Sequence, residues 1–201
     1  MKRLRVSLAC AGLLAACTGL QPQPVEPQNI FLLEASAVAT VPGPKTDQII
    51  EIEMPRSRVG FDTAHMAYTR RPSEIEYFSR NQWADTPARM LAPALAQAIE
   101  QTGAFRAVVR DASAVHPDLR LETELIRLQQ NFAVHPSRVE IAVRVLLIGS
   151  GATGKLATAQ FEESEDASSE DPYGGVMAAN RALSRLVGRV AEFCTLQLSR
   201  P

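Results

Sequence analysis

Alternation of apolar and polar positions over residues 119–163 is the clearest pattern in this chain. Leucine or threonine occupies every second position from 119 to 125, with charged residues between, and valine or isoleucine does so from 139 to 145. A period of two predicts strands with one buried and one solvated face. His135–Pro136 marks one turn and Gly149–Gly154 a second, so we expect a three-stranded antiparallel meander.

Two segments repeat their apolar residues with a helical period instead. The first has Thr86 as a candidate N-cap and Pro87 in its first turn, and it ends near Gly103, although Pro93 removes one backbone hydrogen bond. The second runs from about Pro172 to Leu198. One face of each is apolar, as expected for a helix that packs on a sheet. The apolar stripe of the second is Val176, Ala179, Leu183, Leu186, Val187, Val190 and Phe193.

Shorter apolar runs predict the remaining strands. They lie at residues 30–35, 48–54, 65–70, 74–79 and 105–109. The acidic stretch 162–171 is interpreted as a surface loop. Strands, a helix, more strands and a closing helix predict an α+β fold, with a mixed or antiparallel β-sheet and two amphipathic helices packed on one face.

The first residues have the pattern of an export signal. A basic start precedes a short apolar stretch, and Leu14-Ala15-Ala16-Cys17 resembles the lipobox at which bacterial lipoproteins are acylated and cleaved. The alternative is an ordinary signal peptide with a chance cysteine. We therefore expect a signal peptide over 1–16, an acylated Cys17 with a proline-rich tether over 17–29, and one domain over 30–201. Lipid that includes palmitate would hold the chain on a membrane without a spanning helix.

Charge and cysteine content exclude some classes of function. The chain without residues 1–16 has 22 acidic and 18 basic residues. A mildly acidic domain does not suit nucleic-acid binding, which needs a basic face. Cys194 would be the one thiol left after acylation, and its apolar surroundings favour a buried core residue over a reactive one.

The motifs of common enzymes are incomplete or missing. Residues 149–155 nearly match a phosphate-binding loop, but Leu156 stands where a hydroxyl residue is needed and a strand rather than a helix is expected to follow. A glycine-rich turn is the preferred interpretation. The three histidines, His65, His116 and His135, have no metal-binding spacing. We expect neither enzymatic activity nor a metal or other cofactor beyond the lipid on Cys17.

Residues 77–87 read Tyr-Phe-Ser-Arg-Asn-Gln-Trp-Ala-Asp-Thr-Pro, an aromatic strand followed by a Trp-Ala pair and a helix that starts with proline. With the lipobox and Phe31-Leu32-Leu33, this resembles the ABC-type transport auxiliary lipoprotein family, the PqiC-like proteins. The resemblance implies a non-catalytic subunit that docks an MCE-type periplasmic protein and its ABC permease and ATPase. The implied cargo is phospholipid or another hydrophobic molecule, and a homo-oligomeric ring is one implied arrangement. Thr18, in place of aspartate after Cys17, implies the inner leaflet of the outer membrane, facing the periplasm.

Six side chains are candidates for partner docking, each with a plainer alternative. Trp83 either packs the following helix on the sheet or is an exposed anchor, since Trp is enriched at binding hot spots. Tyr77 and Phe78 would point to opposite faces of a strand, one to the core and one to a partner. Arg181, Arg185 and Arg189 line one helix face as either a solvated stripe or a docking stripe. Two other functions are kept open: a stand-alone periplasmic carrier of a hydrophobic ligand, and a lipid-anchored hydrolase.

Overall fold

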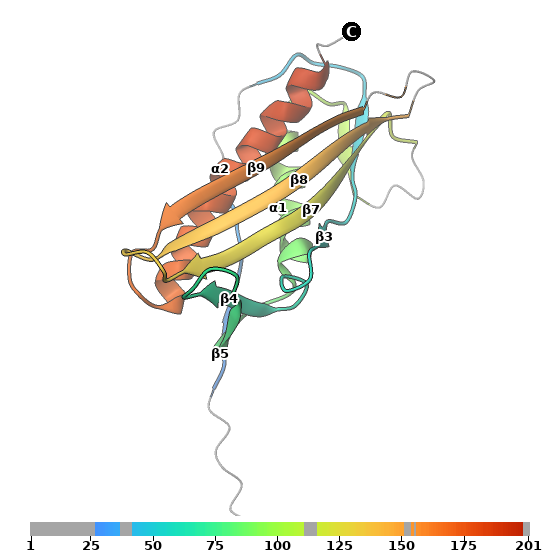
Figure 1. The fold of residues 1–201 in the computed structure, drawn as a ribbon. Helices are drawn as coiled ribbons and strands as arrows, with labels where there is room; N and C mark the ends of the chain where they lie inside the picture. Colours follow the sequence, from blue (N-terminus) through green and yellow to red (C-terminus); the bar gives the residue numbers. More distant parts are fainter. Residues whose placement is uncertain (1–26, 37–41, 111–115, 151–153, 155, 199–201) are drawn as a thin grey trace, which may run out of the picture.

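A computed structural model describes residues 27–36, 42–110, 116–150, 154 and 156–198. The predicted signal peptide, Cys17 and most of the predicted tether lie outside these residues. The described chain forms one mixed sheet and two helices, which confirms the predicted α+β class (Figure 1). Both helices, α1 (Pro87–Gln101) and α2 (Pro172–Leu198), pack on the same face of the sheet.

A three-stranded meander forms the larger part of the sheet, as the alternation predicts. β7 (Leu119–Asn131) pairs antiparallel with β8 (Arg138–Gly149), and β8 pairs antiparallel with β9 (Leu156–Asp166). β9 has no second strand partner among the described residues, so it forms an edge of the sheet.

The other edge of β7 receives three short strands one after another, all parallel to it. These are β2 (Ile49–Ile52), β3 (Arg56–Ser57) and β4 (His65–Thr69). Beyond β2 lies β6 (Ala107–Val109) in parallel. Beyond β4 lies antiparallel β5 (Glu76–Trp83), which pairs in parallel with β1 (Asn29–Phe31). Three strands of the N-terminal half, β2, β3 and β4, thus share one long partner, β7.

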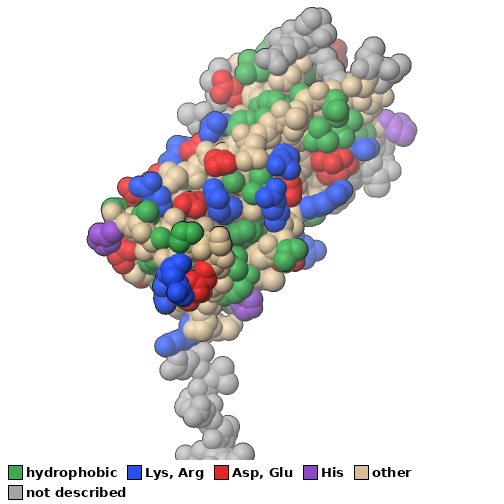
Figure 2. All heavy atoms as spheres, viewed as in Figure 1, with side chains coloured by type: hydrophobic (Ala, Val, Ile, Leu, Met, Phe, Trp, Pro, Cys, Tyr) green, Lys and Arg blue, Asp and Glu red, His purple; other side chains and the backbone are tan. Residues whose placement is uncertain are grey.

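The core lies between the inner face of the sheet and the two helices. Its fully buried side chains come from both layers and include Ile50, Leu121, Ile141, Val143, Leu95, Ile99, Leu183 and Leu186. The outer face of the sheet is charged instead, and Figure 2 shows arginine and acidic side chains interspersed across it. None of the described helices combines the length and apolar character that a membrane span requires.

Three sequence-based predictions need correction. The acidic stretch 162–171 is not a loop throughout, because β9 continues to Asp166. The first strand ends at Phe31 rather than at residue 35, and the backbone N–H groups of Glu34 and Ser36 donate to α2 side chains instead. The fourth predicted strand, 74–79, starts later and extends to Trp83. In each case the deciding contacts are with α2 or another strand, and a local pattern does not encode them.

The helix starts differ in how they are capped. Thr86 is the N-cap residue of α1, as expected, but its side chain makes no capping hydrogen bond. Pro93 lies on the exposed side of α1, and the helix continues through it. At α2 the carboxylate of Asp171 accepts the N–H of Gly174 at 2.7 Å, and this interaction satisfies one of the unpaired donors of the first turn.

Candidate docking surface

Phe78 packs in an aromatic cluster at one end of the sheet. Its ring centroid lies 4.5 Å from that of Tyr68 and 6.3 Å from that of Phe132, and the last two rings are 5.8 Å apart in an edge-to-face arrangement. Such pairs contribute about 0.5–1.5 kcal/mol beyond the area they bury. The cluster joins β4, β5 and the chain after β7, so Phe78 faces other residues of this domain rather than solvent.

Tyr77 points to the other side of β5, as the strand period predicts. Its side chain is 39% exposed, and its hydroxyl donates a hydrogen bond of 3.0 Å to the carbonyl oxygen of Gly60. Gly60 has a φ of 95°, in the left-handed region that glycine adopts without strain. The ring of His65 packs against that of Tyr77 at 5.8 Å. Tyr77 therefore holds the loop between β3 and β4 in place.

That loop forms one wall of a surface groove of about 590 Å³, which we name the β4–β5 groove. The groove lies over the outer face of the sheet, between the β3–β4 loop, the β4–β5 turn and β7. Its apolar lining consists of Val59, Phe61, Pro72, Ile75, Ile126 and Ala133. Val59 is 93% exposed and Ile75 is 40% exposed. Large apolar side chains gathered in one open depression are typical of an interaction site.

A β-bulge in β7 provides part of the groove floor. The pairing register with β8 shifts between Leu125 and Arg127, so Ile126 is an extra residue on its strand. Leu125 and Leu128 are both buried, whereas Ile126 and Arg127 both line the groove. The bulge thus places an isoleucine on a face that is otherwise charged, which fits the known use of bulges to redirect side chains.

The arginines at the rim of the groove are already paired. Arg58 lies 3.1 Å from Glu124, Arg71 lies 2.8 Å from Glu74, and Arg127 lies 3.4 Å from Glu140 and 3.6 Å from Glu162. Because these arginines are paired with carboxylates around an apolar floor, the groove does not favour binding of a free anion. It matches the usual composition of a protein-binding surface, apolar in the centre and polar around it.

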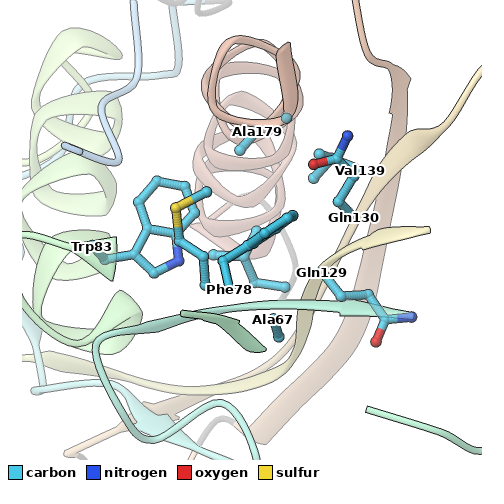
Figure 3. Close-up of a pocket in the computed structure, with 10 residues that line it drawn as sticks. Ala67, Phe78, Trp83, Gln129, Gln130, Val139 and Ala179 are labelled. Atoms are coloured by element: carbon cyan, nitrogen blue, oxygen red, sulfur yellow. The ribbon is translucent and has the colours of Figure 1, made fainter. Parts of the chain in front are cut away.

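Trp83 is buried, with 4% of its side chain exposed. Figure 3 shows it near Phe78, in the layer between the sheet and α2. The burial supports the packing interpretation of this residue over the docking one. The space around Trp83 and Phe78 amounts to about 10 Å³, enough for about one water molecule. This cavity is therefore too small for the hydrophobic ligand of a stand-alone carrier.

Arg181, Arg185 and Arg189 form a clamp between α2 and the edge strand β9. Arg181 lies 2.6 Å from Glu165, and Arg189 lies 2.7 Å from Glu163. Arg185 lies between them, 3.0 Å from Glu163 and 2.8 Å from Glu165. The like charges on the helix face are thus balanced by carboxylates at alternate positions of β9. We call these five side chains the arginine clamp.

The same guanidinium groups also bind the backbone at the free edge of β9. They donate to the carbonyl oxygens of Glu162, Ser164 and Asp166 at 3.1, 3.0 and 3.2 Å. An uncovered strand edge is a template for pairing with another chain, and proteins usually block it. The clamp satisfies these acceptors within the domain.

The clamp shifts the acid–base equilibria of both carboxyl groups. Burial alone would raise the pKa of Glu163, but hydrogen bonds from Arg189 and Arg185 outweigh burial and hold that pKa below its ordinary value. The pKa of Glu165 is also lowered, first by its hydrogen bond to Arg181. Both carboxyl groups are therefore ionised at neutral pH.

The sequence indicated Tyr77, which supports the groove, as a docking candidate. It did not identify the apolar residues that line the groove. One signal was present. Leu125 and Ile126 are adjacent apolar residues and Leu128 follows out of phase, which breaks the alternation of β7 and indicates a bulge. No local pattern indicated that Val59 and Ile75 would lie together, because the groove depends on the Tyr77–Gly60 contact between separate segments.

Comparison with known proteins gives a family for this chain. No curated protein matches it significantly. Protein XCC0632 of Xanthomonas campestris has a similar structure, with a TM-score of 0.73 at 20% identity over 85% of this chain and 97% of that one. An uncharacterized protein aligns with a TM-score of 0.64 at 14% identity, over 87% of this chain and all of its own. Residues 31–191 match the model of the ABC-type transport auxiliary lipoprotein component. This match covers most of the chain, which therefore belongs to the ABC-type transport auxiliary lipoprotein family.

Proposed function

We propose that this protein is a lipid-anchored auxiliary subunit of an MCE-linked ABC-type envelope transport system, and that it works by docking rather than catalysis. The family match over residues 31–191 carries the proposal. The cargo would be phospholipid or another hydrophobic molecule that passes through the partner proteins. This division of roles agrees with the cavity beside Trp83 and Phe78, which is too small to hold a lipid.

The anchor would be lipid, including palmitate, on Cys17, in the inner leaflet of the outer membrane. The lipobox-like sequence before Cys17 and the absence of aspartate after it support this position. Growth with labelled palmitate should label the full chain but not Cys17→Ser, and the variant should leave the membrane fraction. Equal labelling, or unchanged fractionation, would contradict the anchor. Separation of the two membranes on a density gradient decides the sorting.

We assign docking of the MCE-type partner to the β4–β5 groove. An exposed apolar floor with a neutralised rim suits a protein surface. Val59 is the most useful probe, because at 93% exposure its replacement should leave the domain folded.

The test is affinity recovery from envelope extracts with residues 18–201 as bait and identification of the partner by mass spectrometry. Val59→Asp should weaken recovery of an MCE-type protein about tenfold, or about 1.4 kcal/mol, because it places a charge in the apolar centre of the contact. Leu156→Asp is the matched control, since Leu156 is 71% exposed and lies outside the groove. Equal recovery with both variants would exclude the groove. Failure of the unaltered bait and of the full-length protein to recover any MCE-type partner would contradict the function itself. Light scattering on the same preparation measures whether a homo-oligomeric ring forms.

A further inference from the structure

The chain that enters the domain runs alongside the first turns of α2. The ring centroids of Phe31 and Tyr173 are 6.3 Å apart. Further along, the N–H of Glu34 donates to the side-chain oxygen of Asn180 at 3.0 Å, and the N–H of Ser36 donates to the hydroxyl of Ser184 at 2.9 Å. The two segments therefore run side by side in the same direction, and residue 32 lies level with the second turn of α2.

Four large apolar side chains stay exposed where these segments meet. Phe31 and Leu33 turn toward the core, so Ile30 and Leu32 turn outward and are 62% and 54% exposed. On α2, Tyr173 and Met177 lie one turn apart on one helix face and are 60% and 38% exposed. We name Ile30, Leu32, Tyr173 and Met177 the N-terminal apolar patch. Exposed apolar groups gathered in one place mark an interaction surface more often than scattered ones do.

The two acidic residues just before α2 accept hydrogen bonds from within the domain. The carboxylate of Asp171 accepts hydrogen bonds from the N–H of Gly174 and the hydroxyl of Ser169 at 2.7 and 3.0 Å. The carboxylate of Glu170 accepts the N–H of Ser137 at 2.8 Å. These hydrogen bonds hold both side chains in place at the start of α2.

The position of the patch in the chain points to its occupant. Only residues 18–28 separate Cys17 from β1, a length of at most about 40 Å when fully extended. β1 lies at the end of the domain opposite the C-terminus (Figure 1). A lipid on Cys17 would thus hold the patch close to the membrane at a high effective concentration, so that even weak contact is populated.

We propose that the N-terminal apolar patch rests in the headgroup region of the membrane that carries the Cys17 lipid. This inference rests on the lipid anchor of the proposed function. Tyrosine and aliphatic side chains suit the boundary between headgroups and acyl chains. Such contact orients the domain, with the β1 end toward the lipid and the C-terminal end of α2 away from it.

Fluorescence quenching by lipid tests this orientation with single introduced cysteines. Residues 18–201 carry an N-terminal histidine tag that binds nickel-chelating lipid, in vesicles of phosphatidylethanolamine and phosphatidylglycerol that contain doxyl-labelled lipid. Leu32→Cys and Met177→Cys carry the fluorophore on the patch. Leu196→Cys is the matched control, because Leu196 is a 55% exposed apolar residue of the same helix, about 28 Å further along. The thiol of Cys194 is fully buried, with its pKa raised to about 12, and stays unlabelled.

Strong quenching at positions 32 and 177, with little at 196, is the expected result. Adding Tyr173→Asp should lower the quenched population at position 177 at least about tenfold, because an unpaired carboxylate is strongly disfavoured in an apolar environment. Aspartate at this helix start is compatible with the helix dipole, so the fold should persist.

Absence of quenching at all three positions, or equal quenching at all three, would overturn the proposal. A disulfide-linked dimer of unlabelled Met177→Cys in solution would also overturn it, because a second copy would then cover the patch. The tag replaces the natural anchor, so these results do not depend on acylation. Failure of palmitate labelling would instead contradict the proposed function and leave the quenching result standing.

Discussion

Replacement of Arg185 by methionine separates a structural role of the α2 arginines from a docking role. Methionine keeps much of the apolar stem of the side chain and removes the guanidinium. In the clamp that group lies 3.0 Å from Glu163 and 2.8 Å from Glu165, and it donates to the carbonyl oxygen of Ser164 at 3.0 Å. Arg185→Met therefore removes three interactions at once between α2 and the edge of the sheet.

The size of the effect follows from the exposure of the partners. Arg185 is 43% exposed, so water screens its charge, and an isolated exposed ion pair would contribute only about 0.2–1 kcal/mol. Glu163 is only 14% exposed, however, and hydrogen bonds to charged groups contribute about 1.5–3 kcal/mol. Arg189 remains to pair Glu163. We therefore expect a loss of about 1.5 kcal/mol in the free energy of unfolding, and a fall in Tm of about 3–6 °C.

Urea denaturation followed by circular dichroism measures this loss. We expect unfolding at a lower urea concentration and an unchanged dependence of the free energy of unfolding on urea concentration. Arg89→Met is the matched control on α1. Arg89 forms an ion pair with Asp85 at 3.6 Å, and the two side chains are 65% and 47% exposed, so the substitution should cost less than about 0.5 kcal/mol. If Arg185→Met costs no more than Arg89→Met, the clamp does not stabilise the domain. If its stability is unchanged but partner recovery falls, the docking stripe is the correct interpretation.

Three further results are expected. Asp171→Ala should lower the free energy of unfolding by about 1 kcal/mol, measured by thermal melting, since the N–H of Gly174 loses its capping acceptor. The folded-state pKa values of Glu163 and Glu165 are lowered, so their contribution is complete above the ordinary value of 4.5 and is lost as pH falls below it; denaturation at pH 7 and pH 3.5 should show a smaller difference in Arg185→Met, and an equal difference would contradict the assignment. The thiol of Cys194, with its pKa raised to about 12 by burial, should react with a thiol reagent only in denaturant; rapid reaction of the folded protein would contradict its burial.

The parts of the fold that sequence predicts well are those with long periodic patterns. β7 and β8 alternate apolar and polar residues over most of their length, and α2 keeps one apolar stripe from Val176 to Phe193. A period sustained over many residues identifies both the type of element and its buried face. The placement of two helices on one side of the sheet follows, because each buries one stripe and the alternating strands offer only one apolar face.

Contacts between distant segments explain most of what sequence reasoning missed. Glu163 and Glu165 indicate a solvated loop when taken alone, yet they pair with β8 as part of a strand, and the arginines of α2 balance their charge. β3 has two residues and no periodicity, and it exists because β7 offers an edge to pair with. The candidate site was predicted in part, since Tyr77 supports the groove but its apolar lining comes from turns and a bulge.

The three short strands on one edge of β7 set an order in which this domain can fold. Ile50 pairs with Leu119 and Ala67 with Gln129, so each strand pairs with a segment about 60–70 residues later in the chain. Synthesis delivers β2, β3 and β4 first, and the edge of β7 that joins all three is complete only when residue 131 has emerged. In a precursor that crosses a membrane as an extended chain, the sheet would therefore stay incomplete until more than half of the chain has passed through.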